Sequence, residues 1–161
     1  MRAGQWLVVA LVGSAALTGG GIWYMQEYGF YAPIDPASER ASVMIVARED
    51  GAARVLPVRD FQGIDASSSP IRYRACFVTD PPEEGEAMPY PDPTPLIGPG
   101  WFDCFDAGRL TEDLASGTAV AYLSASDIRP DVDRVVAVYP DGRAFAWHQY
   151  NQKIPDRGVM D

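Results

Sequence analysis

Cys76 and Cys104 are the residues whose type and spacing are best suited to covalent chemistry. Each lies in a short segment that we predict to be a strand, RACF for Cys76 and FDCF for Cys104. In an oxidising compartment the pair could form a disulfide that closes a loop of about 27 residues and stabilises the fold by about 3 kcal/mol. In a reducing compartment the two cysteines would be buried thiols. Their spacing excludes a CxxC redox pair.

The only histidine, His148, is a second candidate for chemistry. A hydrolase would need it beside a serine, for instance from Ser67–Ser69, and beside an orienting acid. The serines lack the G-x-S-x-G context of a nucleophile, and a catalytic zinc site uses more than one histidine. No phosphate-binding glycine loop follows a predicted strand, and the acidic runs lack the ligand order of a calcium loop. We therefore predict no catalytic residues, no metal site, no cofactor and no enzymatic activity.

The N-terminal segment determines the cellular location in which such residues would act. Between Trp6 and Met25 the chain has no charged residue and no proline. As a helix this stretch spans about 30 Å, the thickness of the hydrocarbon core of a bilayer. Trp6 at one end and Trp23 with Tyr24 at the other are typical of the two membrane interfaces. We predict a transmembrane anchor over residues 1–26.

A cleaved signal peptide is the alternative to an anchor, because small residues at 14–16 could form a cleavage site. The apolar run continues beyond a typical signal core, which favours an uncleaved helix. Arg2 and the α-amino group are the only positive charges before the helix, and the next basic residue, Arg40, is distant. The positive-inside rule then predicts a cytoplasmic N-terminus and a periplasmic C-terminal domain on a single-pass protein of a bacterial inner membrane.

One stripe of the predicted anchor consists of small residues: Ala10, Ser14, Thr18 and Gly21. Small side chains at this spacing let a second helix approach closely, and serine or threonine can hydrogen-bond across the contact. The stripe therefore predicts a packing face for a multispanning partner. The alternative is that small residues are simply common in transmembrane helices.

The rest of the chain predicts an α+β fold, in which a small and mostly antiparallel sheet packs against one helix. We expect a linker at 27–40, the domain at 41–150 and a polar tail at 151–161. Asp50-Gly51 and Asp141-Gly142 are hairpin signals. Residues 60–70 and the proline-rich stretch Pro81–Pro99 are predicted loops. The expected helix covers 109–115, and the expected strands cover 42–49, 53–58, 71–79, 101–105, 120–123, 135–139 and 144–149.

The chain is acidic, with a formal net charge of −9. Nucleic-acid binding needs a basic surface to contact phosphates, so the charge disfavours it. A domain of this charge would instead attract a basic protein, for which a small positively charged electron carrier is one candidate. Ordinary solubility is the alternative explanation.

Three segments carry a resemblance to a known family: FQGIDASSSPIRYRACF, GPGWFDCFDA and DRVVAVYPDGRAFAWHQ. Together with the aromatic end of the anchor, they resemble a small uncharacterised family of alphaproteobacterial single-anchor membrane proteins. The resemblance implies an anchored α+β domain. It implies no catalytic residue, because none is established for that family.

Three functions follow as hypotheses. The first is a non-enzymatic accessory or assembly subunit of a larger inner-membrane complex, such as a respiratory one, whose acidic domain caps the outer face of a multispanning partner. The second is a membrane-tethered binding module for a soluble basic protein such as a c-type cytochrome. The third and weakest is a tethered hydrolase that uses His148.

Overall fold

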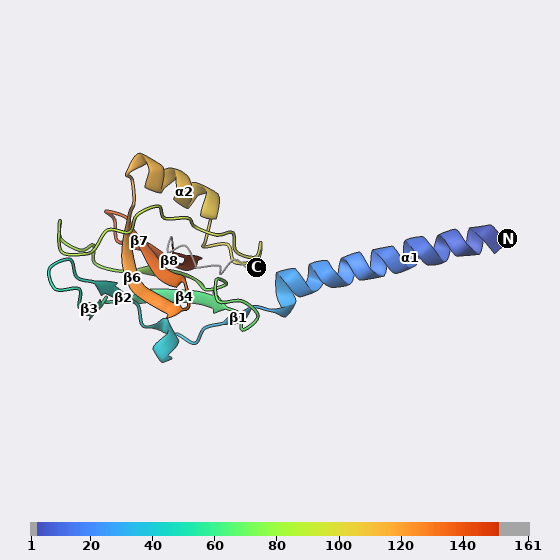
Figure 1. The fold of residues 1–161 in the computed structure, drawn as a ribbon, viewed down its shortest axis with the longest axis horizontal. Helices are drawn as coiled ribbons and strands as arrows, with labels where there is room; N and C mark the ends of the chain where they lie inside the picture. The colour runs from blue at the N-terminus through green and yellow to red at the C-terminus, as the bar shows by residue number, and fades with distance from the viewer. Residues whose placement is uncertain (1–2, 152–161) are drawn as a thin grey trace, which may run out of the picture.

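The computed structural model describes residues 3–151 and has two parts, a long helix and a compact α+β domain (Figure 1). Helix α1, Ala3–Tyr24, continues into a π-helical turn, Met25–Gly29, and none of its residues is buried. Its 22 residues extend about 33 Å, so the helix is long and apolar enough to cross a membrane.

The domain is built on a six-stranded sheet in which every neighbouring pair is antiparallel. This arrangement confirms the predicted fold class, with α2 as the one α-helix beside the sheet in the described part of the chain. The strand order is β1-β4-β5-β8-β7-β6, and a separate antiparallel hairpin pairs β2 with β3. The bounds are β1 Ala32–Pro33, β2 Met44–Val46, β3 Ala53–Val55, β4 Arg59–Asp65, β5 Arg74–Val78, β6 Val120–Arg129, β7 Val132–Val138, β8 Arg143–Tyr150 and α2 Ala107–Ser116.

Both faces of the central strands are buried, which explains why these strands are apolar on both sides. Alternate residues of β5 separate the two cores, with Ala75 and Phe77 on one side and Cys76 on the other. The β2–β3 hairpin covers the first face, while α2 and the segment before it cover the second. Trp147 has no exposed surface and lies in the second core, as its alternation with Ala146 predicts.

Helix α2 begins and ends where its sequence signals predict. The Asp106 side chain accepts a hydrogen bond from the Arg109 backbone N–H at 3.0 Å, which caps the first turn. Gly117 follows the last turn with φ of 76°, a left-handed conformation that glycine adopts without strain.

Two predictions in the middle of the chain are wrong. Residues 60–70, expected as a loop, contain most of β4, because pairing with β5 buries Gly63 and Ile64 despite the loop-like composition. Residues 101–105, expected as a strand, form turns. Phe102 and Phe105 both point into the second core, and this spacing of three suits a turn and not a strand.

The segment predicted as a linker, 27–40, is instead partly built into the domain. Strand β1 pairs with β4, and Ile34 is buried in the first core while its backbone N–H donates to Gly63 O at 2.8 Å. The domain therefore starts close to the end of α1. Of the predicted tail, only Asn151 is among the described residues; the remainder lies outside them.

The proline-rich loop has no regular secondary structure, as predicted, but it connects the two sheets. Met88 donates its backbone N–H to Val46 O at 2.8 Å and accepts from the Leu123 N–H at 3.0 Å. On either side of Met88, Ala87 forms an isolated antiparallel bridge with Ala47, and Pro89 forms one with Tyr122. The loop thus runs as an extended segment between β2 and β6.

Candidate functional site

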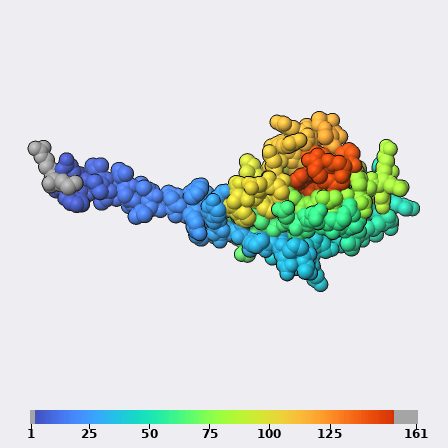
Figure 2. All heavy atoms as spheres, turned by 180° about the vertical axis from the view of Figure 1, so that it is seen from behind, coloured from blue at the N-terminus to red at the C-terminus, as the bar shows by residue number. Residues whose placement is uncertain are grey.

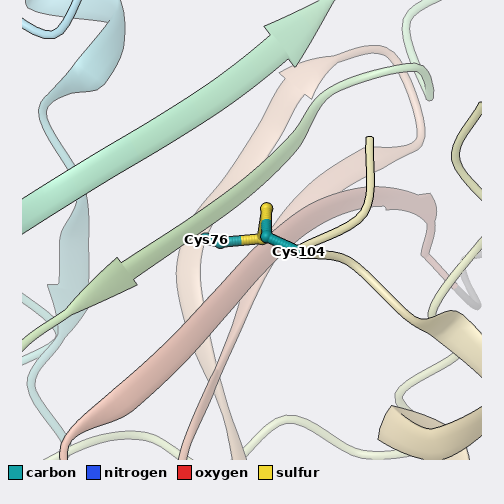
Figure 3. Close-up of a disulfide and its surroundings, with 2 residues drawn as sticks. All are labelled: Cys76 and Cys104. Atoms are coloured by element: carbon teal, nitrogen blue, oxygen red, sulfur yellow. A yellow bond between two sulfur atoms is a disulfide. The ribbon is translucent and has the colours of Figure 1, made fainter. Parts of the chain in front are cut away.

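A disulfide joins Cys76 of β5 to Cys104 of the turn that precedes α2 (Figure 3). Their Cα atoms lie 6.2 Å apart, within the range that a disulfide requires. Cys76 occupies a strand as predicted, whereas Cys104 does not. The bond fixes the segment around residue 104 to the centre of the sheet.

The same segment holds the end of the long helix. Trp101 Nε1–H donates to the backbone oxygen of Glu27 at 2.7 Å, and the Gly100 N–H donates to the Glu27 carboxylate. The Trp101 ring also meets the Tyr31 ring edge-on, with centroids 6.4 Å apart. We call these contacts of Glu27 and Tyr31 with Gly100 and Trp101 the exit clamp. Because the disulfide fixes residue 104, the clamp connects α1 to the core of the domain.

Exposed apolar side chains surround the clamp. Ile97 is 84% exposed although it lies in the loop that leads into Trp101. Trp23 and Tyr24, predicted as anchors at a membrane interface, are exposed and pack against Tyr28 with ring centroids 5.9 and 5.5 Å apart. These side chains gather where the helix meets the domain, an arrangement that suits a membrane–water interface.

Arg74 attaches the proline-rich loop to the sheet. Its side chain is only 2% exposed, and its guanidinium donates to four backbone carbonyls. The two loop acceptors are Leu96 O at 2.6 Å and Ile97 O at 3.4 Å. Burial lowers the pKa of Arg74 to about 10, so the group stays charged at neutral pH. The sequence signal that could have revealed it is an arginine directly before the apolar run 75–78 of the predicted strand.

His148 is held in a way that differs from the arrangement that the hydrolase hypothesis requires. Its Nδ1–H donates to Pro70 O at 2.8 Å, and its Nε2 accepts from Arg134 Nε–H at 3.0 Å. Since both ring nitrogens are engaged by groups other than a serine, no lone pair is left to activate a hydroxyl. The ring also stacks on Tyr73 with centroids 4.5 Å apart. Within residues 3–151, no cluster of potential metal ligands occurs.

The His148 environment predicts a specific loss of stability in acid. Burial, followed by the charge of Arg134, lowers the pKa of His148 to about 3, below the ordinary value of 6.5. The unfolded chain therefore binds more protons below pH 6.5, and the folded state loses up to about 1.4 kcal/mol per pH unit between pH 6.5 and 3. In urea unfolding at pH 7 and pH 4.5, His148→Gln should lose less stability on acidification than wild type. An equal loss in both proteins would show that His148 is not the group responsible.

Beside His148 the surface is hollowed into a groove of about 970 Å³. Among the described residues, three arginines line it, namely Arg40, Arg129 and Arg134, but only one carboxylate, Asp65. Ser67 and Ser69, from the serine segment Ser67–Ser69 of the hydrolase hypothesis, also line it. The sequence does not predict this groove, since its walls come from four segments far apart along the chain.

The predicted packing stripe lies entirely on the surface of α1. Ala10, Ser14, Thr18 and Gly21 are all exposed, and no residue of α1 is buried by the described part of the chain. Ser14 Oγ–H donates to Leu11 O at 3.0 Å within the helix, so its hydroxyl is satisfied without a partner chain. Trp6 is exposed at the opposite end from Trp23.

Comparison with known proteins identifies the domain by family alone. No curated protein and no solved structure matches the chain. A family model matches residues 43–156, which cover the domain from β2 onward and leave α1 and β1 outside. This match agrees with the resemblance of the domain segments to an uncharacterised family. The chain belongs to DUF6446, a family of unknown function.

Proposed function

We propose that the protein is a non-enzymatic accessory or assembly subunit of a larger inner-membrane complex, of which a respiratory complex is one example. Helix α1 spans the membrane once with its N-terminus in the cytoplasm, and the domain lies in the periplasm. The helix packs on a multispanning partner, and the domain caps the outer face of that partner.

The exit clamp is the observation that carries this proposal. Glu27 and Tyr31 directly follow the helix and are held by Gly100 and Trp101 of the domain. A domain on a free tether would sample many positions, whereas this attachment restricts the domain to the membrane surface beside α1. A neighbour packed on α1 would then meet the domain in one orientation.

The surface of α1 supports a protein neighbour. No described part of the domain covers its small-residue stripe. Beyond its chain neighbours and the adjacent helix backbone, a Cβ atom added at Gly19, Gly20 or Gly21 would have no atom of the described chain within 4 Å, so this surface is open. A helix backbone from another subunit can approach such a surface closely. The occupied nitrogens of His148 favour a role in assembly over one in catalysis.

Purification in a mild detergent tests this proposal. The wild-type chain should migrate in a particle much heavier than a 17.5 kDa monomer in its micelle. Ser14→Leu combined with Thr18→Leu should release the chain as a monomer, because the larger side chains block close helix approach. Val12→Leu, on the opposite side of the helix, is the control and should leave the particle intact. A monomeric wild type, or equal loss in the control, would contradict the proposal.

A tethered binding module for a basic soluble protein, such as a c-type cytochrome, is the second candidate. The β2–β3 hairpin and segment 81–86 form the end of the domain farthest from α1 (Figure 2). This end is acidic, and its residues Glu49, Asp50, Glu83, Glu84 and Glu86 outnumber the nearby Arg48 and Arg54. Binding there should weaken steeply as ionic strength rises, and an unchanged affinity would exclude it.

A further inference from the structure

The arginine-lined groove has a local charge opposite to that of the whole chain. Asp65 is paired with Arg40 at 2.5 Å, so this carboxylate is already neutralised within the groove. Neither Arg129 nor Arg134 forms an ion pair with a carboxylate among residues 3–151. Two uncompensated positive charges therefore face one cavity in a protein of net charge −9.

Arg134 is held in place before any ligand arrives. Its Nε–H donates to His148 Nε2 at 3.0 Å, and its guanidinium carbon lies 4.4 Å from the centroid of the Tyr73 ring. Tyr73 in turn stacks on His148. The two terminal nitrogens of Arg134 make no hydrogen bond with the described part of the chain. A guanidinium fixed in this way loses little further freedom when it binds an oxyanion, which favours affinity.

The other walls of the groove suit an ester more than a bare ion. Ser67 and Ser69 add hydroxyl groups, which can donate to an oxyanion. Apolar surface from Phe30, Ile128 and Tyr150 lines the same cavity. Its volume of about 970 Å³ is large for a single anion and falls within the range of organic ligand sites.

We propose that this groove binds a phosphate ester, with Arg129 and Arg134 contacting the phosphate and the apolar wall contacting its organic group. Phe30 and Ala32 place the groove directly after the end of the long helix. A lipid headgroup and a small soluble phosphate ester share this chemistry. The proposal does not depend on the accessory role, since it concerns the domain alone.

Calorimetric titration of the full chain in maltoside micelles tests the site. The soluble probe is glycerol 3-phosphate; the lipid probe is short-chain phosphatidylglycerol, compared with short-chain phosphatidylcholine. We expect saturable binding of at least one anionic probe. Arg134→Gln should weaken it about tenfold or more, because a charge-assisted and bidentate contact is lost.

Two further variants are needed to interpret the titration, one within the groove and one outside it. Arg129→Gln removes an exposed arginine, so it should weaken binding even if Arg134→Gln disturbs the packing on Tyr73. Arg48→Gln is the matched control, because Arg48 is exposed, makes no ion pair with the described residues and lies on the β2–β3 hairpin away from the groove. If both groove variants weaken the binding of glycerol 3-phosphate, the result supports a soluble ester as the ligand. If they weaken the binding of phosphatidylglycerol alone, the result supports a lipid headgroup.

The absence of saturable binding to both anionic probes, or equal weakening by Arg48→Gln, would overturn the proposal. The migration of the protein in mild detergent is a separate readout that the groove variants should not change. Failure of the phosphate site therefore leaves the accessory role standing, and failure of the accessory role leaves the phosphate site standing.

Discussion

Replacing Arg74 by methionine is expected to lower the free energy of unfolding by about 3 kcal/mol, among the largest effects of any single substitution in the domain. Methionine fills part of the buried space but donates no hydrogen bond. The carbonyls of Leu96 and Ile97 would lose the donor that holds the proline-rich loop to β5. Urea unfolding of the full chain in micelles measures this loss.

The matched control for this substitution is Arg59→Met. Arg59 is exposed and pairs with Asp80 at 2.9 Å on the surface, where solvent screening leaves an ion pair with little effect on stability. If Arg74→Met destabilised the protein no more than Arg59→Met does, the buried guanidinium would not be what fastens the loop.

Removing the disulfide is expected to cost a similar amount. The chain-entropy model assigns about 3 kcal/mol to a bond that joins positions 28 residues apart. Cys76→Ala combined with Cys104→Ala should shift the urea midpoint downward, since the unfolded chain regains the freedom that the bond removes. Alanine is preferred to serine because Cys76 is buried in the second core.

A reductant supplies the control for the double substitution. Wild type treated with a thiol reductant should unfold at the midpoint of the double variant, while the variant itself should not respond to the reductant. A wild-type midpoint that is unchanged by reductant, and equal to that of the variant, would show that the bond does not stabilise the protein. Arg74 and the disulfide restrain neighbouring segments, so their effects are not expected to add fully.

Local chemistry explains which elements the sequence predicts correctly. The turn at Asp141-Gly142 requires glycine at position 142 for two reasons. Gly142 has φ of 89°, and an added Cβ would lie 2.6 Å from Thr79 O. Gly51 likewise has a positive φ at the β2–β3 turn. The residues that cap α2, Asp106 and Gly117, are likewise adjacent in sequence to that helix. Each of these signals lies within a few residues of the structure it predicts.

Strand β4 and the turns at 101–105 depend on partners that are distant along the chain. Asp60 and Gly63 are typical of a loop, and only pairing with β5 makes their segment a strand. Trp101 resembles a strand residue, but its indole is directed by Glu27, 74 positions earlier. The pattern of apolar and polar residues within 101–105 cannot reveal a contact with a residue so distant along the chain.

The candidate site was harder to predict for the same reason. The pairing of Cys76 with Cys104 needs no geometry once the compartment is assumed, because the chain has only two cysteines. The groove instead requires residues 30–40, the segment Ser67–Ser69, the β6–β7 turn and β8 to come together. That Arg129 and Arg134 have no carboxylate partner among residues 3–151 becomes visible only in three dimensions.

Photo-crosslinking inside native membranes tests most directly whether α1 packs on another protein. A photoreactive residue at position 14, in the small-residue stripe, should yield a covalent product heavier than the chain itself. The same probe at position 12, on the opposite side of the helix, should yield little. Equal products from both positions, or a mature chain whose mass lacks the first twenty-odd residues, would contradict the account.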